Sequence, residues 1–301
     1  MINLSKYIIG NDELINSMLI SFQEKNLSNS IIFHGPKGIG KATLVLNLIS
    51  KIFKQFLNND KYENHYKLIY NNSHPNIRYI QRSFEEKNKK INKFITIDQI
   101  RNLNNFINQS SFNNLPKFIV IDSANHLNIN SSNALLKILE EPKKNTYFFL
   151  IAHQISSILH TIRSRCIKFK LEIPNKDQFN KILESCNQEI KHQDIDFLYH
   201  ISNASPGLAL DINSEKISFL FESIYNVLQI NDNKENEEIF KLADSVNNLS
   251  NDEFRIFLMI LRFILLSSIK INLGIKTDPI SFNQVNYNMS KINLDNLNIL
   301  N

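Results

Sequence analysis

A glycine-rich stretch, GPKGIGKAT at residues 35–43, has the spacing of a phosphate-binding loop. Its candidate phosphate-binding residues are three glycines and a lysine: Gly35, Gly38, Gly40 and Lys41. The glycines allow backbone N–H groups to point inward, and the partial positive charge at the start of the following helix favours an anion. The motif G-x-x-x-x-G-K-[S/T] breaks at Ala42, because alanine lacks the hydroxyl that would bind Mg²⁺. The stretch predicts phosphate binding and weakens the case for metal-dependent hydrolysis; a plain glycine turn between a strand and a helix is the alternative.

An aspartate ends the buried strand expected at KFIVID, residues 117–122. Asp122 stands where a protein with a phosphate-binding loop keeps its metal-holding carboxylate, although an aspartate that caps a turn is the alternative. Many hydrolases place a glutamate next, and Ser123 cannot replace it as the carboxylate base that polarises water. Thr43 comes one residue too late to supply the missing hydroxyl and should point elsewhere on its helix. These residues predict weak binding of ATP or ADP that is not required for function, without hydrolysis.

Arginines occupy two places where they could contact phosphate. In TIRSRCIKF, at residues 161–169, Ser164, Arg165 and Cys166 lie where a helix should give way to a strand. The plain interpretation is an arginine that complements the carboxyl end of the helix. Arg101, in TIDQIRNL, is a candidate contact to DNA phosphate, which would give salt-dependent and sequence-independent binding. A solvated helix face is the alternative for Arg101.

Strands and helices alternate in the first part of the chain. Buried apolar strands are expected from Ser30 and at KFIVID and TYFFLIAHQ, each followed by a helical pattern. Such alternation favours right-handed crossovers and a parallel sheet with flanking helices. Residues 54–93 are polar and broken, with one short strand expected at NIRYIQ. After Pro174 the pattern becomes wholly helical, which predicts a small helical domain followed by a larger one.

Composition limits the class of protein. The 301 residues are 43% hydrophobic and 10% aromatic, which suffices for two or three globular domains, and the net charge of +5 permits contact with a polyanion. Cys166 and Cys186 have no CxxC spacing, so neither a disulfide framework nor a zinc site is expected. The apolar residues 254–271 are interrupted by Arg255 and Arg262, which predicts a buried helix and no membrane span. The N-terminus lacks the features of a secretory signal, and a cytoplasmic location is expected.

Several motifs taken together resemble bacterial clamp-loader subunits of the AAA+ class, and among these the delta prime family of DNA polymerase III. They are FHGPKGIGKATL, SHPN, ITIDQIRNL, FIVIDSANHLNINSSNALLKILEEP, TYFFLIAH and ILHTIRSRCIKF. The pair NALLKILEEP and RSRC is specific, whereas the loop by itself is common. The similarity covers residues 8–170 and extends weakly to SNASPGLAL. It implies an α/β P-loop AAA+ module of the RecA type at residues 1–171, a helical lid at 172–212 and an all-α collar at 213–301.

The resemblance also implies partners and residue roles. Such subunits assemble through their collars with gamma/tau and delta subunits into a hetero-pentamer, which opens the sliding clamp and places it on primed DNA. Within the DNA polymerase III holoenzyme, delta prime is considered a rigid member without ATPase activity of its own. Its Ser-Arg-Cys motif gives an arginine to the ATP of a neighbouring subunit. The resemblance thus makes Arg165, flanked by Ser164 and Cys166, the candidate arginine finger in trans, and places Asp122 at the metal-carboxylate position.

Three residues depart from an active ATPase of this class: Ala42, Ser123 and Leu208, which stands where a second-sensor arginine is expected. Residues 53–93 contain no cysteine, so the four-cysteine zinc module of some family members is not expected and no metal site is predicted. The favoured hypothesis is a non-hydrolysing clamp-loader subunit that supplies Arg165 in trans. The alternatives are an active ATPase subunit of the gamma/tau type and an unrelated P-loop regulator that binds DNA.

Overall fold

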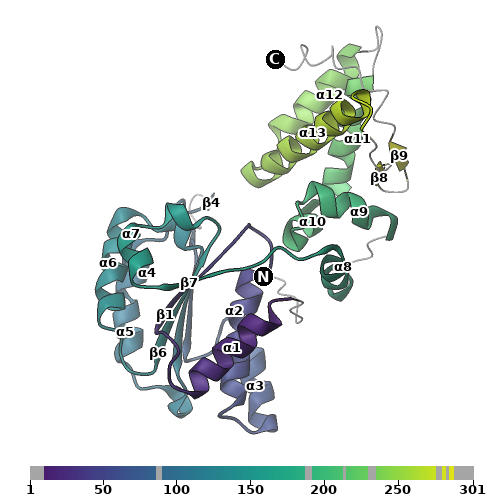
Figure 1. Cartoon of the computed structure of the whole chain (residues 1–301). Coiled ribbons are helices and arrows are strands. Elements are labelled where there is room, and N and C mark those ends of the chain that lie inside the picture. Colours follow the sequence, from purple (N-terminus) through teal and green to yellow (C-terminus); the bar gives the residue numbers. More distant parts are fainter. Residues whose placement is uncertain are drawn as a thin grey trace. The chain divides into compact units, whose positions relative to one another are not determined.

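The computed structural model describes residues 10–85, 90–186, 192–212, 215–229, 235–275, 280–282 and 285–287. The chain divides into two compact units, Met1–Pro174 and Asn175–Asn301 (Figure 1). The first unit is an α/β structure built on a parallel sheet, and the second consists mainly of helices.

The core of the first unit is a five-stranded parallel sheet with the strand order β2-β5-β6-β1-β7. Its three central strands are long apolar runs that are almost fully buried, as expected for a sheet with both faces covered. The predicted parallel sheet is therefore confirmed, and the short strand predicted after Pro75 is its edge strand β2. The strands are β1 (Ser30–His34), β2 (Ile77–Ile80), β5 (Lys117–Asp122), β6 (Thr146–Ala152) and β7 (Ile167–Lys170).

Helices cover both faces of this sheet (Figure 1). Successive side chains of a strand point to opposite faces, so Phe33 packs with the helices of one face and Ile32 with those of the other. The first face carries α1 (Asp12–Gln23), α2 (Lys41–Lys54) and α3 (Asn59–Tyr70). The second carries α4 (Ile97–Arg101), α5 (Leu103–Asn108), α6 (Ile129–Glu140) and α7 (His160–Ser164).

The polar region between α2 and β5 is more ordered than its sequence suggested. It contains α3, which packs against α2, and a short hairpin of β3 (Phe84–Glu85) and β4 (Lys90–Ile91). The helix predicted from Thr96 begins there with a capping box formed with Gln99, but it divides into α4 and α5 at Asn102. Short 3₁₀ turns complete the unit: η1 (Phe112–Asn114), η2 (Ala124–His126) and η3 (Ile155–Ser157).

The second unit has one apolar cluster, which extends from Phe179 to Ile264 across its helices. Because helices on both sides of the predicted boundary at residues 212/213 share this cluster, the division into lid and collar stays a prediction. The expectation of an all-α region is wrong in one respect, since two short strands, β8 (Ile280–Phe282) and β9 (Val285–Tyr287), form a hairpin. The helices are α8 (Lys176–Ser185), α9 (His192–Ile201), α10 (Pro206–Ile212), α11 (Glu215–Gln229), α12 (Glu235–Asn247) and α13 (Asn251–Asn272).

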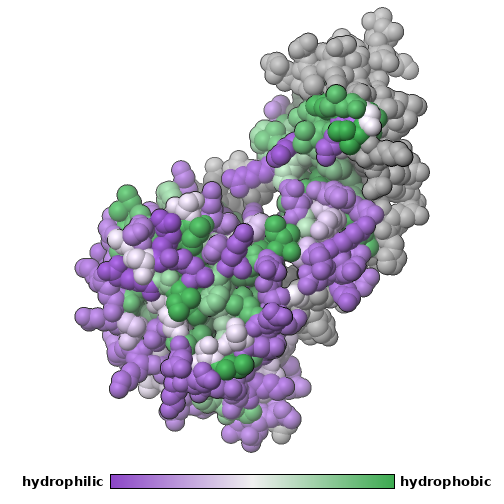
Figure 2. All heavy atoms as spheres, in the orientation of Figure 1, coloured by the Kyte–Doolittle hydropathy of each residue, from purple (hydrophilic) through white to green (hydrophobic). Residues whose placement is uncertain are grey.

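The apolar stretch at residues 254–271 lies in α13, and only one of its faces is buried. Ile260 and Ile264 lie in the cluster, whereas Leu258 and Leu266 are 46% and 44% exposed. Figure 2 accordingly shows apolar side chains on the surface of this unit. No helix in the described ranges is both long and apolar enough to cross a membrane.

Candidate functional site

The glycine-rich loop connects β1 to α2 at the carboxyl edge of the sheet. Gly40 is the N-cap of α2 and has φ 88°, a left-handed conformation that glycine adopts without strain. Gly35 is required for a different reason. A Cβ atom at this position would lie 2.9 Å from Cδ1 of Ile39 and 3.2 Å from the carbonyl oxygen of Leu171. The predicted glycine loop is therefore a tightly packed turn that leads directly into a helix N-terminus.

Lys41 is the first residue of α2, and its side chain folds back onto the loop. It is only 4% exposed, and its Nζ donates hydrogen bonds to the carbonyl oxygens of Gly35 at 2.8 Å and Pro36 at 2.5 Å. Burial lowers the pKa of Lys41 to about 8, and the carboxylate of Asp122 opposes this shift. The loop therefore keeps a mostly protonated ammonium group at neutral pH, held by its own backbone.

Neither of the two residues after Lys41 places a hydroxyl group where the motif has its magnesium ligand. Ala42 is half-buried, and its methyl group packs against the apolar cluster beneath α1 and α2. Thr43 is half-buried one position further along α2, where successive residues point about 100° apart around the helix axis. A magnesium ion at this site would therefore need a ligand from outside the loop.

Asp122 ends β5 and accepts hydrogen bonds from two neutral hydroxyl groups. Tyr79, on the neighbouring strand β2, donates to Oδ2 at 2.5 Å, and Ser123 donates to Oδ1 at 3.2 Å. Burial and the adjacent carboxylate raise the pKa of Tyr79, so the phenol stays protonated and remains a donor. Each oxygen of the candidate metal carboxylate is thus already engaged by a protein hydroxyl.

His153 follows β6 and joins the same hydrogen-bond chain. Its Nε2 lies 2.9 Å from Oγ of Ser123, and its backbone N–H donates to Oδ1 of Asn125 at 2.7 Å. Because Ser123 donates its proton to Asp122, the network assigns the proton of His153 to Nε2. Burial lowers the pKa of His153 to about 4, and the positive charge of Lys41 adds to this effect. The imidazole is therefore neutral at physiological pH.

The structure thus brings Lys41 and Asp122 to one edge of the sheet and adds Tyr79 and His153 to their surroundings. The sequence did not single out Tyr79, and His153 is expected from it to be polar or structural, with phosphate sensing after a core strand as the alternative. The available signal was position, because residues at the carboxyl ends of parallel strands converge on the same edge. That rule indicates His153 after β6 but does not reveal which strand lies beside β5.

Arg165 caps the carboxyl end of α7 and is anchored at two points. Its Nη1 donates to the carbonyl oxygen of Thr161 at 3.0 Å, and its Nη2 lies 2.7 Å from Oε1 of Glu140. The side chains of Arg165 and Glu140 are 39% and 49% exposed. Ser164 donates to the same Thr161 carbonyl at 3.0 Å. The predicted arginine is therefore surface-accessible and ordered.

Cys166 differs from its two motif neighbours because it faces the core. It is 7% exposed and lies in the apolar cluster with the helices of the second sheet face. Burial raises the pKa of its thiol to about 11, so the group is neutral at physiological pH. The Ser-Arg-Cys motif thus combines a buried packing residue with an exposed arginine.

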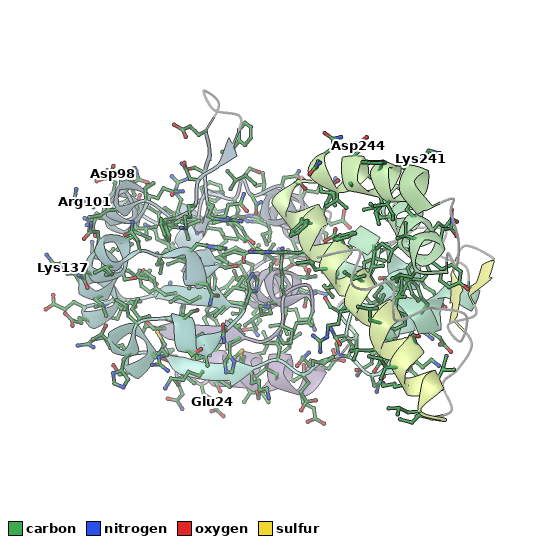
Figure 3. The ribbon with its side chains drawn as sticks, turned by 90° about the horizontal axis from the view of Figure 1, so that it is seen from above. Glu24, Asp98, Arg101, Lys137, Lys241 and Asp244 are labelled. Atoms are coloured by element: carbon green, nitrogen blue, oxygen red, sulfur yellow. The ribbon has the colours of Figure 1, made fainter. Side chains whose placement is uncertain are left out.

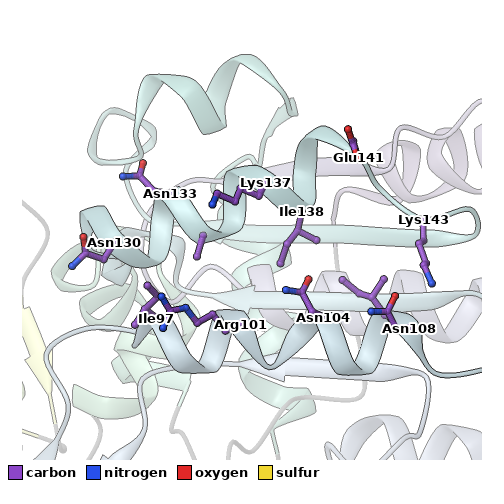
Figure 4. A pocket seen from close by; sticks show the side chains of 12 residues that line it. Ile97, Arg101, Asn104, Asn108, Asn130, Asn133, Lys137, Ile138, Glu141 and Lys143 are labelled. Carbon is purple, nitrogen blue, oxygen red and sulfur yellow. The ribbon is translucent and has the colours of Figure 1, made fainter.

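Arg101 lies on a different surface, at the end of α4. Its Nη1 is 3.7 Å from Oδ1 of Asp98, and both side chains are largely exposed, as Figure 3 shows at the outer edge of the unit. A groove of about 550 Å³ runs between α4 and α5 on one side and α6 on the other. Figure 4 shows Arg101, Asn104 and Lys137 along this groove. Its lining combines asparagine amides and basic side chains with three isoleucines, Ala134 and the acidic Glu141.

Within the described ranges, no three His, Cys, Asp or Glu side chains come together as a metal-binding group. Asp122, the candidate metal-binding carboxylate, is therefore not part of such a group among the residues that the structure describes. The expectation that the chain holds no zinc stays a prediction.

Comparison with known proteins gives matches to subunits of bacterial DNA polymerase III. The family model described as "DNA polymerase III, delta subunit" matches residues 10–175. The delta' subunit of Haemophilus influenzae is 34% identical over 41% of this chain and 37% of its own length. The delta' subunit of Pseudomonas aeruginosa is 28% identical over 63% of this chain and 57% of its own. The matched region thus spans between one third and three fifths of these relatives.

Two further matches have a lower sequence identity. The tau subunit of Bacillus subtilis DNA polymerase III is 24% identical over 70% of this chain and 37% of its own length. The crystal structure of a gamma-subunit-related protein from Thermotoga maritima aligns with 94% of this chain and 96% of its own, with 17% identity and a TM-score of 0.49. The sequence matches carry the assignment to a family. The chain belongs to the bacterial delta prime family of DNA polymerase III, a clamp-loader family of DNA replication.

Proposed function

We propose that this protein is a non-hydrolysing clamp-loader subunit that completes the ATP site of a neighbouring subunit with Arg165. The observation that carries the proposal is the state of Asp122, whose two oxygens accept hydrogen bonds from Tyr79 and Ser123. These two donors orient the carboxylate and use one acceptor site on each oxygen, so Asp122 has less acceptor capacity left for a magnesium ion. The family assignment supplies the context in which such a subunit acts.

The remaining parts of the site support the same conclusion. Mg²⁺ requires oxygen ligands in nearly octahedral geometry, and Ala42 offers none where the loop hydroxyl would stand. Ser123 replaces the glutamate that would polarise an attacking water, and it donates its proton to Asp122 instead. The loop retains Lys41 and its glycines, so it is suited to weak ATP or ADP binding without turnover.

Arg165 supports the second half of the proposal. An arginine finger in trans must be exposed, ordered and fully charged, and Arg165 is part-exposed and anchored at two points. Such a group accelerates phosphoryl transfer by about 10³- to 10⁵-fold in the site it completes. The neighbours we propose are gamma/tau and delta subunits in a cytoplasmic hetero-pentamer that loads the sliding clamp onto primed DNA.

The experiment is reconstitution of the complete loader with its partner subunits, followed by single-turnover ATP hydrolysis in the presence of clamp and primed DNA. Arg165→Ala is expected to remove one site's share of the fast hydrolysis phase. Lys168→Ala is the matched control, because it removes another exposed positive charge from the next strand, β7. If the loader with Arg165→Ala keeps the wild-type amplitude of the fast phase, the role of Arg165 in trans is excluded.

The alternative of an active gamma/tau-type ATPase has one favourable observation, the retained Lys41 in an intact glycine loop. It predicts ATP hydrolysis by the isolated chain that disappears in Lys41→Ala. Our proposal predicts that hydrolysis by the isolated chain is equal for the wild type and this variant, at the level of a buffer control.

We also propose that the groove beside α4 contacts the phosphate backbone of DNA. Arg101 and Lys137 line it from opposite sides, and their positive charges suit phosphate without reading bases. Arg101→Ala in the assembled loader should weaken binding to primed DNA of any sequence and reduce the slope of log affinity against log salt by about one. An unchanged slope would mean that Arg101 belongs to a solvated face.

A further inference from the structure

The two motifs that make the family resemblance specific are joined by a direct contact. Glu140 is the last residue of α6, within LLKILEEP, and Arg165 caps α7, within RSRC. Oε1 of Glu140 lies 2.7 Å from Nη2 of Arg165, although the two residues are far apart in the sequence. Leu139 and Ile162, next to these ends, pack in the same apolar cluster and hold the two helices together. This packing holds in place the two helix ends that carry Glu140 and Arg165.

We propose that Glu140 is a positioning residue, which holds the guanidinium of Arg165 in the orientation needed to reach a phosphate of the neighbouring subunit. This inference rests on the proposed function of Arg165. Glu140 accepts from Nη2 while the Thr161 carbonyl accepts from Nη1, so two different nitrogens of one planar group are anchored. Anchoring two of its nitrogens fixes the plane of the guanidinium, and its remaining N–H groups can address an anion.

Folding stability does not explain this pair. With side chains 39% and 49% exposed, both charges remain screened by water, and exposed ion pairs contribute little to stability. The same exposure leaves the guanidinium accessible to another molecule. An arginine that is already ordered loses less conformational entropy when it binds, so a pre-arranged finger acts more effectively than a mobile one.

Glu140 also opposes the positive charge of Arg165, which would weaken its attraction for phosphate. In this exposed setting the opposing charge is screened, whereas the loss of one of two anchors changes the position of the reacting group directly. Positioning should therefore be the larger effect. Glu140→Ala is expected to lower the rate of neighbour-site hydrolysis by about tenfold, less than loss of the finger itself, because the Thr161 anchor remains.

The maximal single-turnover rate constant should fall, and the ATP concentration that gives half of this maximum should stay unchanged. An arginine finger acts on charge that develops in the transition state, so its misplacement costs turnover more than ground-state binding. Glu140→Gln keeps an oxygen acceptor of the same length without the charge. This variant should retain activity within about threefold of wild type, because one neutral acceptor still holds Nη2.

The test uses the reconstituted loader and single-turnover ATP hydrolysis with wild type, Glu140→Ala, Glu140→Gln, Arg165→Ala and the double variant Glu140→Ala/Arg165→Ala. Glu172→Ala, which removes another exposed carboxylate after β7, is the matched control and should equal wild type. Circular dichroism of each isolated variant checks folding, and the Gln variant keeps the test informative if Glu140→Ala folds poorly. The inference predicts that Glu140→Ala slows hydrolysis when Arg165 is present and changes nothing when Arg165 is absent.

Other outcomes separate the inference from the proposed function. Wild-type rates with Glu140→Ala, together with slow rates with Arg165→Ala, would overturn the inference and leave the arginine finger intact. Faster hydrolysis with Glu140→Ala, or slowing that persists in the Arg165→Ala background, would also overturn it. Wild-type rates with Arg165→Ala would overturn the proposed function, and the inference with it.

Discussion

Lowering the pH from about 7.5 to about 5 should destabilise the α/β unit through a pair of buried histidines. His74 and His65 are 3% and 5% exposed, and Nε2 of His74 lies 2.7 Å from Nδ1 of His65. Nδ1 of His74 accepts a hydrogen bond from the backbone N–H of Asn76 at 3.1 Å, so the proton of His74 must lie on Nε2 and point at His65. A second proton on either ring would disrupt this arrangement.

The magnitude follows from the pKa of His74. Burial, and secondly the neighbouring His65, lower it from 6.5 in the unfolded chain to about 4. Above pH 6.5 the ring is neutral in both states and pH has no effect through this group. As the pH falls below 6.5 the unfolded chain gains a proton that the folded chain resists until about pH 4, so stability is lost at about 1.4 kcal/mol per pH unit. At pH 5 the loss amounts to about 2 kcal/mol.

Amide hydrogen exchange of the full-length chain is a suitable assay, with peptides that cover β5 and rates corrected for their intrinsic pH dependence. His74→Asn should be less stable than wild type at neutral pH but should lose about 2 kcal/mol less on acidification. His153, whose pKa burial also lowers, is present in both proteins and cancels from the comparison. His160→Asn makes the same substitution at an exposed histidine and is the matched control. Identical acid dependence of wild type and His74→Asn would refute the reasoning.

Three substitutions test other contacts of the α/β unit. Tyr79→Phe removes a donor to the ionised Asp122 and should lower the free energy of unfolding by about 1.5–3 kcal/mol in urea titrations; an unchanged midpoint would mean that water replaces the phenol. Gly35→Ala places a methyl group 3.2 Å from the carbonyl oxygen of Leu171 and should lower the free energy of unfolding by about 1–3 kcal/mol, measured by thermal melts. A melting temperature equal to that of wild type would contradict the tight packing of the loop. Asn76→Ala removes a side-chain amide that donates to the carbonyl oxygen of Phe112 and accepts from its N–H, each at 2.8 Å. Amide hydrogen exchange around η1 should therefore become faster. Unaltered exchange would show that these two bonds do not hold η1 in place.

The sequence predicted the parallel sheet because its central strands are continuous apolar runs that alternate with helical patterns. It did not predict α3, since that segment is rich in polar residues and only His65 and Ile69 are buried among the described residues of the helix. The split between α4 and α5 at Asn102 was also missed, because apolar residues continue at helical spacing through the break. Periodicity reports which residues face the core and is less sensitive to where the backbone changes direction.

The candidate site shows the same limit. Lys41 and Asp122 could be predicted because motif spacing along the chain defines them. Tyr79 could not be predicted in this way, because its contact with Asp122 requires β2 to lie beside β5. The local sequence of a strand does not determine which strand is its neighbour. The link from Glu140 to Arg165 likewise needs the packing of α6 against α7. Sequence motifs thus identify the side chains that could act on phosphate. The contacts that Tyr79 and Glu140 make with such side chains become visible only in the fold.

The most direct test compares Lys41→Ala with Arg165→Ala in the reconstituted loader, with single-turnover ATP hydrolysis in the presence of clamp and primed DNA as the readout. If this chain completes a neighbour's site without hydrolysing ATP itself, Lys41→Ala leaves the fast phase at its wild-type amplitude and Arg165→Ala removes one site's share of it. The reverse pattern, with hydrolysis lost in Lys41→Ala and retained in Arg165→Ala, would contradict the account.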